Sequence, residues 1–334
     1  MFNDKNLLIS GNSHPEFAAN LANHIGADLC SADVSKFKNG EIKVIINESV
    51  RKKNCFIIQT TSQSETNSPN DNLMEIFIII DALKRGSAES VTVVMPYYAY
   101  ERQDRKDYSR APISATVVST CLEALGADRV MVYDLHAGQI QGFFSNKVPL
   151  DHLYIEPFFI NYIKEYILPN HTLDELIVVA PDEGAVKRAV RVSSALNCGT
   201  ATIFKERSKP GIVDKMTLMG DVKGKIGVII DDIIDTAGTA CKAADTLKEH
   251  GCNKVFMLAS HGILSDPATE RINKSQFDEV IVTNTVPISD YKKNGKLKII
   301  DVSWLAAQSI INQIKGESLQ KLFNDHHLYK VKIL

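Results

Sequence analysis

The chain has 334 residues, 44% of them hydrophobic, and can therefore bury two cores of ordinary domain size. Its formal net charge of −2 excludes a global positive field, so we expect neither nucleic acid nor a membrane as a partner, and any anion site must be built locally from Lys and Arg. Six scattered cysteines without a CxxC pair exclude a disulfide framework and a zinc site, and they favour a reducing cytoplasmic location.

Short apolar runs alternate with helical stretches along the chain, which is typical of an α/β protein with mainly parallel sheets. The expected strands are Asn6–Ser10, Cys55–Thr60, Val91–Met95, Val130–Tyr133, Leu176–Ala180, Ala201–Phe204, Ile226–Ile230, Val255–Ala259 and Glu279–Val282. The expected helices are Glu16–Ile25, Asn72–Lys84, Ala115–Leu125, Glu156–Tyr166, Ala185–Ala195 and Ala240–His250. Several of these helices are followed by a glycine, the usual C-terminal stop.

An internal echo suggests that the chain contains one fold twice. Residues 122–136 and 247–261 share a helix end, a glycine, a strand and a terminal His at an offset of 125 residues. We therefore expect two similar doubly wound domains. They would span residues 1–150 and 151–323, and residues 324–334 would form a tail of unknown role.

Two segments of the first half contain residues suited to a nucleotide. Phe37-Lys38-Asn39-Gly40-Glu41 taken alone signals only a turn. The segment Arg102-Gln103-Asp104-Arg105-Lys106 follows an expected strand at the edge where open α/β sheets bind ligands. Three cations beside aromatic residues suit a triphosphate and its base, although a solvated charged loop would have the same composition.

Three further segments carry candidate polar groups. His136 follows the strand Val130–Tyr133 and is suited either to a structural hydrogen bond or to a metal ion. Asp182 lies in the sequence Ala180-Pro-Asp-Glu-Gly-Ala185 after the next expected strand. Lys205 and Arg207 precede a polar turn, where they could fold over phosphates or form a surface ion-pair cluster.

The stretch from Gly224 to Gly251 is the most informative part of the chain. An apolar strand is expected to end at Asp231 and Asp232, and the loop Asp235-Thr236-Ala237-Gly238-Thr239 then leads into a helix. The amide groups and dipole at the start of a helix favour a phosphate, while the two carboxylates can accept bonds from sugar hydroxyls or hold a metal ion. This order of features predicts a site for a phosphorylated sugar.

These motifs together resemble those of the class I ribose-phosphate diphosphokinases, which belong to the type I phosphoribosyltransferase-like superfamily. The resemblance covers residues 3 to 323. It implies transfer of the β,γ-diphosphoryl group of ATP to the C1 hydroxyl of ribose 5-phosphate, with Mg²⁺ as the cofactor and a homo-oligomer, commonly a hexamer, as the assembly. The departure from the family pattern is Ala185, where a second glycine is usual; a positive φ there would strain an alanine.

The resemblance also assigns site residues. It implies that ATP contacts Phe37, Asn39, Gly40, Glu41, Arg102, Gln103, Asp104 and Arg105. Ribose 5-phosphate would contact Arg207, Asp231, Asp232, Asp235, Thr236, Ala237, Gly238 and Thr239. His136 and Asp182 would bind the metal, and Lys205 and Arg207 would stabilise the transition state.

Two other functions stay open. A phosphoribosyltransferase would use the segment Asp231 to Thr239 to bind phosphoribosyl diphosphate as a substrate, but it would leave the charged segment at Arg102 without a task. A non-catalytic regulatory homologue of the synthase would not need the intact set of charged site residues.

Overall fold

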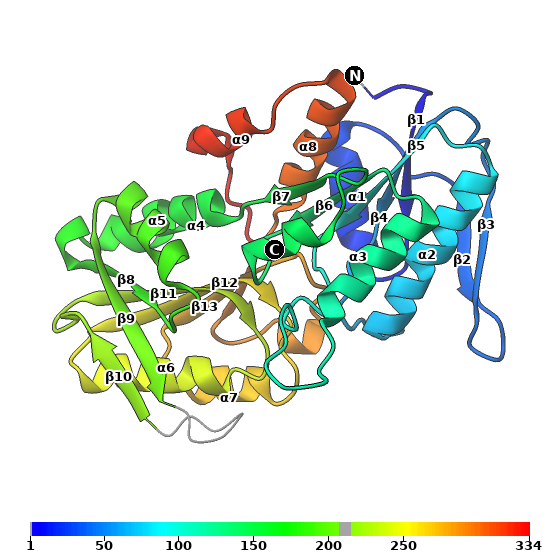
Figure 1. Ribbon diagram of the computed structural model, residues 1–334. Coiled ribbons are helices and arrows are strands. Elements are labelled where there is room, and N and C mark those ends of the chain that lie inside the picture. Colours follow the sequence, from blue (N-terminus) through cyan, green and yellow to red (C-terminus); the bar gives the residue numbers. More distant parts are fainter. Residues whose placement is uncertain (1, 207–214) are drawn as a thin grey trace. The chain divides into compact units, whose positions relative to one another are not determined.

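The structure, a computed structural model, describes residues 2–206 and 215–334, and these residues form two compact units (Figure 1). Unit 1 contains Met1–Tyr154, Thr285–Pro287 and Val302–Lys321. Unit 2 contains Ile155–Asn284, Ile288–Asp301 and Leu322–Leu334. The predicted division into residues 1–150 and 151–323 was therefore too simple. Residues 302–321 return to unit 1 because their helix packs on the first helix of the chain.

Unit 1 is built on a parallel sheet with the strand order β1-β4-β5-β6-β7. These strands are Asn6–Ser10, Asn54–Ile58, Ser90–Met95, Arg129–Tyr133 and Leu150–Leu153. The four strands before β7 are mainly buried apolar residues, as expected of parallel strands covered on both faces. The predicted strands at the first four of these positions are confirmed.

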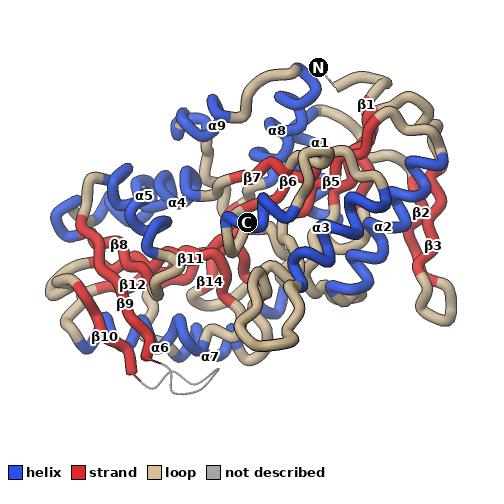
Figure 2. Tube along the Cα trace, viewed as in Figure 1, coloured by secondary structure: helices blue, strands red, loops and turns tan. Residues whose placement is uncertain are grey.

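Helices cover both faces of this sheet, and Figure 2 shows the helices flanking the strands of unit 1. They are α1 (Pro15–Ile25), α2 (Pro69–Arg85), α3 (Ser114–Leu125) and α8 (Ser303–Lys315). Residues of α2 and α3 share one core with alternate strand residues such as Ile57, Val93 and Val132. On the other face, Phe17 of α1 packs edge-on against Tyr133 of β6, whose hydroxyl donates to Val302 O and accepts from Ala306 N.

A two-stranded antiparallel hairpin, β2 (Ala32–Lys36) with β3 (Ile42–Ile46), is separate from the main sheet and was not predicted. Its side chains are half exposed and carry no strong alternation that a sequence pattern would reveal. The turn at its tip contains Gly40, whose φ of 92° favours glycine.

Unit 2 contains a larger sheet with the order β10-β9-β8-β11-β12-β13-β14, which is parallel except for β10. Its strands are Leu176–Ala180 (β8), Gly199–Glu206 (β9), Lys215–Met219 (β10), Ile226–Ile234 (β11), Lys254–Gly262 (β12), Glu279–Thr283 (β13) and Leu297–Ile300 (β14). Successive strands run outward from β8 in one direction and from β11 in the other. The order therefore reverses between β8 and β11.

Helices also lie on both faces of the unit 2 sheet. They are α4 (Glu156–Tyr162), α5 (Val186–Leu196), α6 (Gly238–Glu249) and α7 (Ala268–Lys274), and the short α9 (Gln320–Asn324) follows α8 in the chain. Residues of α6 and α7 share a core with β8, β11 and β12, while α4 packs on α5. The predicted helix Glu156–Tyr166 ends earlier as an α-helix, because Ile163–Ile167 continues it as a π-helix.

The C-terminal tail is an ordered part of unit 2 that covers the edge of β14. Ile333 pairs with Ile300 in an antiparallel bridge, and the amide of Leu334 donates to Ile299 O at 2.9 Å. Tyr329 is 1% exposed and packs edge-on against Phe158 of α4. Pairing of the tail satisfies backbone groups that an edge strand would otherwise present to another chain.

Asn161→Ala is expected to loosen this tail. Its side-chain amide donates to His326 O at 2.8 Å and to Tyr329 O at 2.6 Å, so alanine removes the donors of two backbone carbonyls. We expect a loss of about 1–3 kcal/mol in the free energy of unfolding. Urea unfolding would measure it, and amide exchange should accelerate in residues 326–334. Lys330→Ala, at an exposed position on the same segment, is the control; equal loss in both variants would contradict the role of Asn161.

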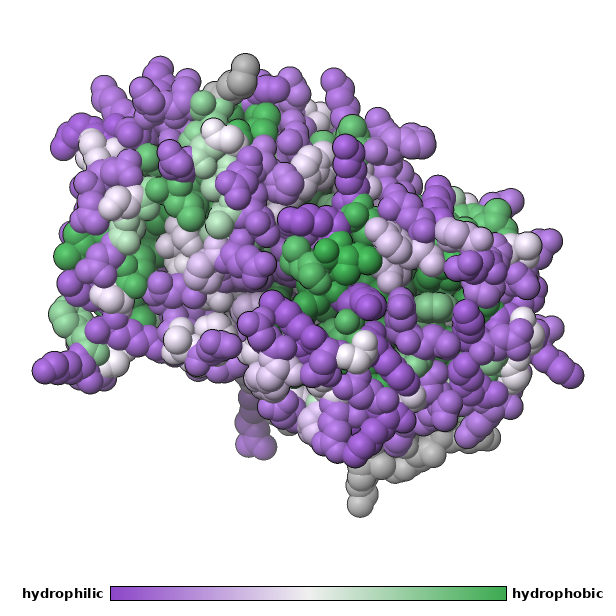
Figure 3. Space-filling view, turned by 180° about the vertical axis from the view of Figure 1, so that it is seen from behind, coloured by the Kyte–Doolittle hydropathy of each residue, from purple (hydrophilic) through white to green (hydrophobic). Residues whose placement is uncertain are grey.

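The described residues include no helix that is both long and apolar enough to cross a membrane. On the face drawn in Figure 3, hydrophilic side chains predominate and hydrophobic ones gather in separate patches.

Candidate functional site

The reversal of strand order in unit 2 marks the place where an α/β sheet binds its ligand. At such a switch point the loops after two neighbouring parallel strands diverge and leave a crevice at the carboxyl edge. Here the strands are β8 and β11, which pair from Leu176 with Ile226 to Val179 with Ile229. Asp182 follows β8, and Asp231, Asp232 and the loop from Asp235 continue from the paired part of β11. The structure therefore brings these predicted residues to one edge.

The two carboxylates of β11 lie within the strand. The sequence had suggested instead that the strand ends at them. Asp231 pairs with Ala259 of β12, and β11 continues to Ile234 because Ile233 and Ile234 extend the ladder with β12. Asp232 is 8% exposed, and its amide donates to Asp231 Oδ1 at 3.0 Å. The strand thus holds both carboxylates on a rigid element of the edge.

The carboxylates at this edge repel one another. Burial raises the pKa of Asp231 well above its usual 3.8, and the negative charges of Asp232 and Asp182 raise it further, against the opposing effect of Arg188. Such a pKa shift is typical of a functional carboxylate group, and a bound cation would relieve the repulsion.

Arg188 of α5 is a site residue that the sequence analysis missed. Its guanidinium lies 3.5 Å from Asp232 Oδ1 and 4.0 Å from Glu156 Oε1, and its side chain is 12% exposed. Arg191, one helical turn later, binds the same Glu156 with its Nε 2.8 Å from Oε2. In the sequence, the spacing of the two arginines places them on one face of a helix, and this pattern could have indicated that they act together. Their common carboxylate partner lies about 30 residues away in the chain, counting from Glu156 to Arg188 and Arg191.

The loop 235–239 leads directly into α6, which begins at Gly238 and so starts two residues before the predicted helix. Ala237 is the N-cap residue and has a positive φ of 59°, a conformation that non-glycine residues rarely adopt and that clusters at ligand sites. Its side chain has no oxygen with which to cap the helix. The amide groups of the first turn therefore have no side-chain cap from Ala237, an arrangement suited to an anion.

Arg271 of α7 is a second residue that the sequence analysis missed. Its Nη1 donates to Thr236 O at 3.0 Å, and a Cβ at Gly238 would lie 3.5 Å from the same nitrogen. This cation both fixes the loop and adds positive charge beside it. Nothing in the local sequence of α7 predicts that contact, because it depends on how α7 packs beside α6.

The alanine that replaces a usual glycine after Asp182 is not strained. Ala185 has φ −83° and ψ −8°, in the right-handed helical region, and is the N-cap residue of α5. Its amide donates to Asp182 Oδ1 at 3.2 Å. The strain that a positive φ would impose on this alanine is therefore absent, since the backbone at 185 does not require glycine.

The two predicted catalytic cations lie at the limit of what the structure describes. Lys205 belongs to β9 by its backbone, which pairs with Met216 of β10, but its side chain is outside the description. Arg207 lies outside the described residues. The register of the sheet pairs Ala180 of β8 with Thr202 of β9. The backbone of Lys205 therefore lies further along β9, at the same carboxyl edge from which the chain leads to Asp182.

In unit 1, two predicted loops meet. The loop that contains Arg102, Gln103, Asp104 and Arg105 follows β5, and the loop of His136 follows the adjacent strand β6. Buried Glu101 accepts the amide hydrogen of His136 at 2.9 Å, and Asp104 accepts from the Gln139 amide. Arg102 and Arg105 are exposed. These contacts join the loop that carries the exposed cations to the loop of His136, and such a combination is suited to a phosphate and a metal ion.

The other predicted nucleotide residues lie elsewhere in unit 1. Phe37, Asn39, Gly40 and Glu41 form the tip of the β2–β3 hairpin, and Phe37 is 53% exposed. This tip projects from the unit and is separate from the loop after β5 in Figures 1 and 2. Within one chain, the structure does not bring the two groups together.

The metal prediction is divided between the units, because His136 belongs to unit 1 and Asp182 to unit 2. Within the described ranges, no three His, Cys, Asp or Glu side chains form a ready-made metal group. The chemistry of the acidic edge nevertheless fits a hard cation: its donors are carboxylate oxygens, and burial together with their mutual repulsion raises the pKa of Asp231.

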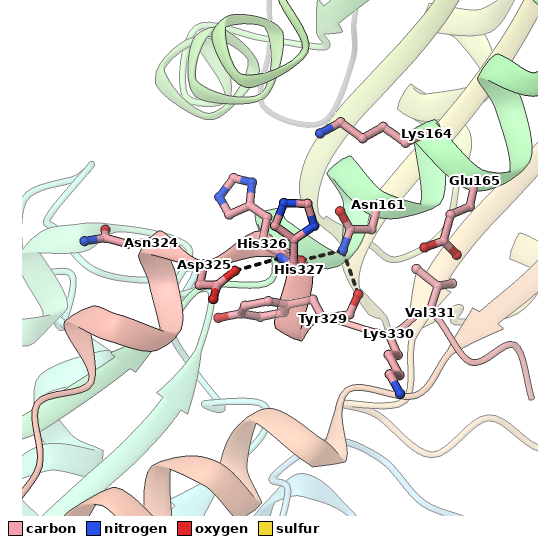
Figure 4. A pocket seen from close by; sticks show the side chains of 10 residues that line it. All are labelled: Asn161, Lys164, Glu165, Asn324, Asp325, His326, His327, Tyr329, Lys330 and Val331. Atoms are coloured by element: carbon pink, nitrogen blue, oxygen red, sulfur yellow. Dashed lines mark hydrogen bonds between the residues drawn. The ribbon is translucent and has the colours of Figure 1, made fainter.

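A pocket of about 590 Å³ lies beside the tail, and its lining side chains are drawn in Figure 4. Those residues are Asn161, Lys164, Glu165, Asn324, Asp325, His326, His327, Tyr329, Lys330 and Val331. Lys164 and Lys330 are balanced in number by Glu165 and Asp325. Burial and the positive charge of Lys164 lower the pKa of His326. The pocket therefore lacks the net positive charge of a phosphate site, and it includes no predicted site residue.

Known proteins resemble this chain along nearly its whole length. Residues 6–126 match the family described as the N-terminal domain of ribose phosphate pyrophosphokinase, and residues 206–324 match the phosphoribosyl synthetase-associated domain. The chain is 42% identical to a ribose-phosphate pyrophosphokinase of Fusobacterium nucleatum, covering 97% of this chain and 100% of that protein. It is 43% identical to ribose-phosphate pyrophosphokinase A of Dictyostelium discoideum, covering 96% and 99% of the two chains.

A solved structure agrees with these sequence matches. The chain resembles the phosphoribosylpyrophosphate synthetase of Mycobacterium smegmatis with a TM-score of 0.86 and 38% identity. The match covers 94% of this chain and 100% of that structure.

Proposed function

The chain belongs to the ribose-phosphate pyrophosphokinase family, and on that premise we propose that it makes 5-phosphoribosyl 1-diphosphate and AMP from ribose 5-phosphate and ATP for nucleotide biosynthesis. The C1 hydroxyl oxygen of the sugar forms a bond to the β-phosphorus of ATP. The bond from that phosphorus to the α,β-bridging oxygen breaks, AMP leaves, and the hydroxyl proton is released. The observation that carries the proposal is the carboxylate pair beside an uncapped helix start at the switch point of unit 2.

This edge is suited to bind ribose 5-phosphate. The first-turn amide groups of α6, reached through the loop 235–239, would bind the 5-phosphate, and Arg271 adds positive charge there. Asp231 and Asp232 would accept hydrogen bonds from the ribose hydroxyls. Because these groups lie on β11 and at the start of α6, the sugar would be held by rigid elements.

ATP would bind to unit 1. Arg102 and Arg105 would contact its phosphates, with Gln103 and Asp104 in the same loop, and Phe37 would pack on the adenine with Asn39, Gly40 and Glu41 beside it. The separation of the hairpin tip from the charged loop supports a homo-oligomer, because one copy's hairpin would then serve another copy's ATP. A hexamer is the form that we propose.

Mg²⁺ is the cofactor that best fits these donors, with His136 and Asp182 as proposed ligands near ATP and the carboxylates of β11 near the ribose. When bound, the ion would neutralise charge on the phosphate oxygens. Lys205 and Arg207 would donate to the transferring diphosphoryl group as it leaves AMP, and positioning of both substrates would supply the rest of the rate enhancement. The six free thiols fit a cytoplasmic location.

The alternatives are less well supported. Relatives that match from end to end are named ribose-phosphate pyrophosphokinases, which disfavours a phosphoribosyltransferase. A non-catalytic homologue would not need the clustered carboxylates, whose burial and mutual repulsion raise the pKa of Asp231.

The direct test is to mix the purified protein with ATP, Mg²⁺ and ribose 5-phosphate and to follow the products by phosphorus NMR. We expect AMP and phosphoribosyl diphosphate to appear in equal amounts. Absence of both would overturn the catalytic proposal. Release of ADP and a sugar bisphosphate would instead show transfer of a single phosphoryl group.

A further inference from the structure

The interior of unit 1 contains a carboxylate that the proposed chemistry does not use. Glu75 of α2 is 0% exposed and accepts four hydrogen bonds. The donors are Asn12 N (3.0 Å), Asn12 Nδ2 (2.9 Å), Gln59 Nε2 (2.6 Å) and Asn67 Nδ2 (2.8 Å). No Lys, Arg or His in the described part of the chain forms an ion pair with it. A fully buried side chain whose two oxygens accept four hydrogen bonds is held in one orientation, and it fixes its donors in turn.

Asn12 connects this carboxylate to the β2–β3 hairpin. Its Nδ2 donates both to Glu75 Oε1 and, at 2.8 Å, to Val34 O of β2. Because both oxygens of Glu75 accept hydrogen bonds from Asn12, Glu75 fixes which end of the Asn12 side-chain amide faces the hairpin. Close packing supports the arrangement, since a Cβ at Gly11 would come within 2.2 Å of Gln59 Oε1.

The hairpin is also attached to unit 1 by an ion pair and by apolar packing. Lys36 lies 3.4 Å from Asp71 Oδ2, but both side chains are about one-third exposed, at 32% and 34%, so solvent screens the pair. Half-buried side chains of both strands, Ala32, Val34, Val44 and Ile46, pack against the core, and α2 lies against β3. An isolated two-stranded hairpin is marginally stable at best in water. The Asn12 bond, although exposed to solvent, adds a directional link from the middle of β2 to the buried carboxylate of Glu75.

We propose that Glu75 is a positioning residue for ATP, acting through Asn12 to hold the hairpin that presents Phe37, Asn39, Gly40 and Glu41. This inference rests on the proposed function, in which the hairpin tip contacts ATP. Glu75 itself touches no substrate. Its two acceptor oxygens hold the amide of Asn12 in place, Asn12 holds β2, and the hairpin sets the affinity for the nucleotide.

Glu75→Gln tests the inference, because the new amide conflicts with Asn12 in either orientation. Asn12 donates to both oxygens of Glu75, so an NH₂ at either place faces one of its donors. If Asn12 turned its amide over to accept from this NH₂, its oxygen would face Val34 O and the anchor would be lost. We expect the KM for ATP to rise about tenfold, with kcat and the KM for ribose 5-phosphate nearly unchanged. Amide exchange in residues 33–46 should accelerate.

Val91→Ala is the matched control, since it opens a cavity at a fully buried position of β5 without touching the hairpin. It should lower the melting temperature but leave the KM for ATP unchanged. An equal rise of that KM in both variants would overturn the proposal, as would an unchanged KM or unchanged exchange in Glu75→Gln. If Glu75→Gln does not fold, Asn12→Ala removes the Val34 bond directly and is judged by the same measurements.

The two proposals can fail separately. If the wild-type protein forms no AMP, the proposed function fails, while exchange in residues 33–46 of the variants still decides whether Glu75 anchors the hairpin. If the wild-type protein is active and Glu75→Gln binds ATP normally, only the present inference fails.

Discussion

Lys205→Ala is expected to lower kcat by about 10²–10³-fold while the KM for each substrate changes much less. The reason is that the lysine would donate to charge that develops on the diphosphoryl group only as the bond to AMP breaks. The strand register supports this position. Ala180 of β8 pairs with Thr202, so β9 carries Lys205 beyond the end of β8, toward the edge from which Asp182 and the β11 carboxylates extend.

Two variants make the Lys205 experiment decisive. Lys205→Arg keeps the charge but changes its geometry, so it should recover part of the lost kcat. Lys223→Ala removes an exposed lysine just before β11, at the opposite end of the strand, and should keep wild-type kinetics. Single-turnover measurement with saturating substrates would separate chemistry from product release. A Lys205→Ala enzyme with wild-type kcat would refute the assigned role.

The fold was predictable where a segment's own residues decide its structure. The run Leu176–Ala180 is wholly buried in a parallel sheet, and its predicted bounds are those of β8. Helices α1 and α3 end where Gly26 and Gly126 adopt positive φ, as their sequences indicate. The echo at residues 122–136 and 247–261 also corresponds to real structure, since α3 and β6 repeat the order of α6 and β12.

The sequence analysis did not predict structure where distant residues decide it. The hairpin strands β2 and β3 lack a clear apolar alternation, and the bond from Asn12 that anchors them comes from the other side of α1 in the sequence. The tail became ordered because Phe158 and Asn161 of α4 bind it. Helix α8 joins unit 1 through α1, nearly 300 residues earlier in a chain of 334.

The residues of the candidate site also differ in whether local sequence or distant contacts reveal them. Asp231 and Asp232 could be proposed from their type and their position after an apolar strand, whereas Asp182 was proposed from the family resemblance. Arg188 and Arg271 could not, since each acts through a tertiary contact with a motif residue, Asp232 for one and Thr236 for the other. Sequence therefore reveals groups that would touch substrates more readily than groups that hold them in place.

Asp231→Asn is expected to weaken catalysis and to stabilise the ligand-free protein at the same time. The amide keeps the shape and the Oδ1 acceptor for Asp232 N, but it cannot supply the carboxylate charge proposed for the ribose side. Loss of a charged hydrogen bond predicts a rise of about 10–100-fold in the KM for ribose 5-phosphate. Neutralising the residue also removes its repulsion with Asp232 and Asp182, so the melting temperature in the absence of ligand should increase.

The pH dependence of that stabilisation follows from the raised pKa of Asp231. Near pH 3.8 and below, where the unfolded group is protonated, wild-type protein carries no penalty at this position, and the two proteins should be about equally stable. As the pH rises from there through the higher folded pKa, ionisation destabilises the wild type, whereas the asparagine variant has no such charge. Their difference in unfolding free energy should therefore grow toward neutral pH and then level off.

Glu270→Gln is the control of opposite sign, because Lys274 lowers the pKa of that exposed carboxylate. Thermal unfolding across pH, without metal or substrate, would measure both variants. A stability difference that stays constant with pH, or an Asp231→Asn protein less stable than wild type at pH 7, would contradict the account of the acidic edge.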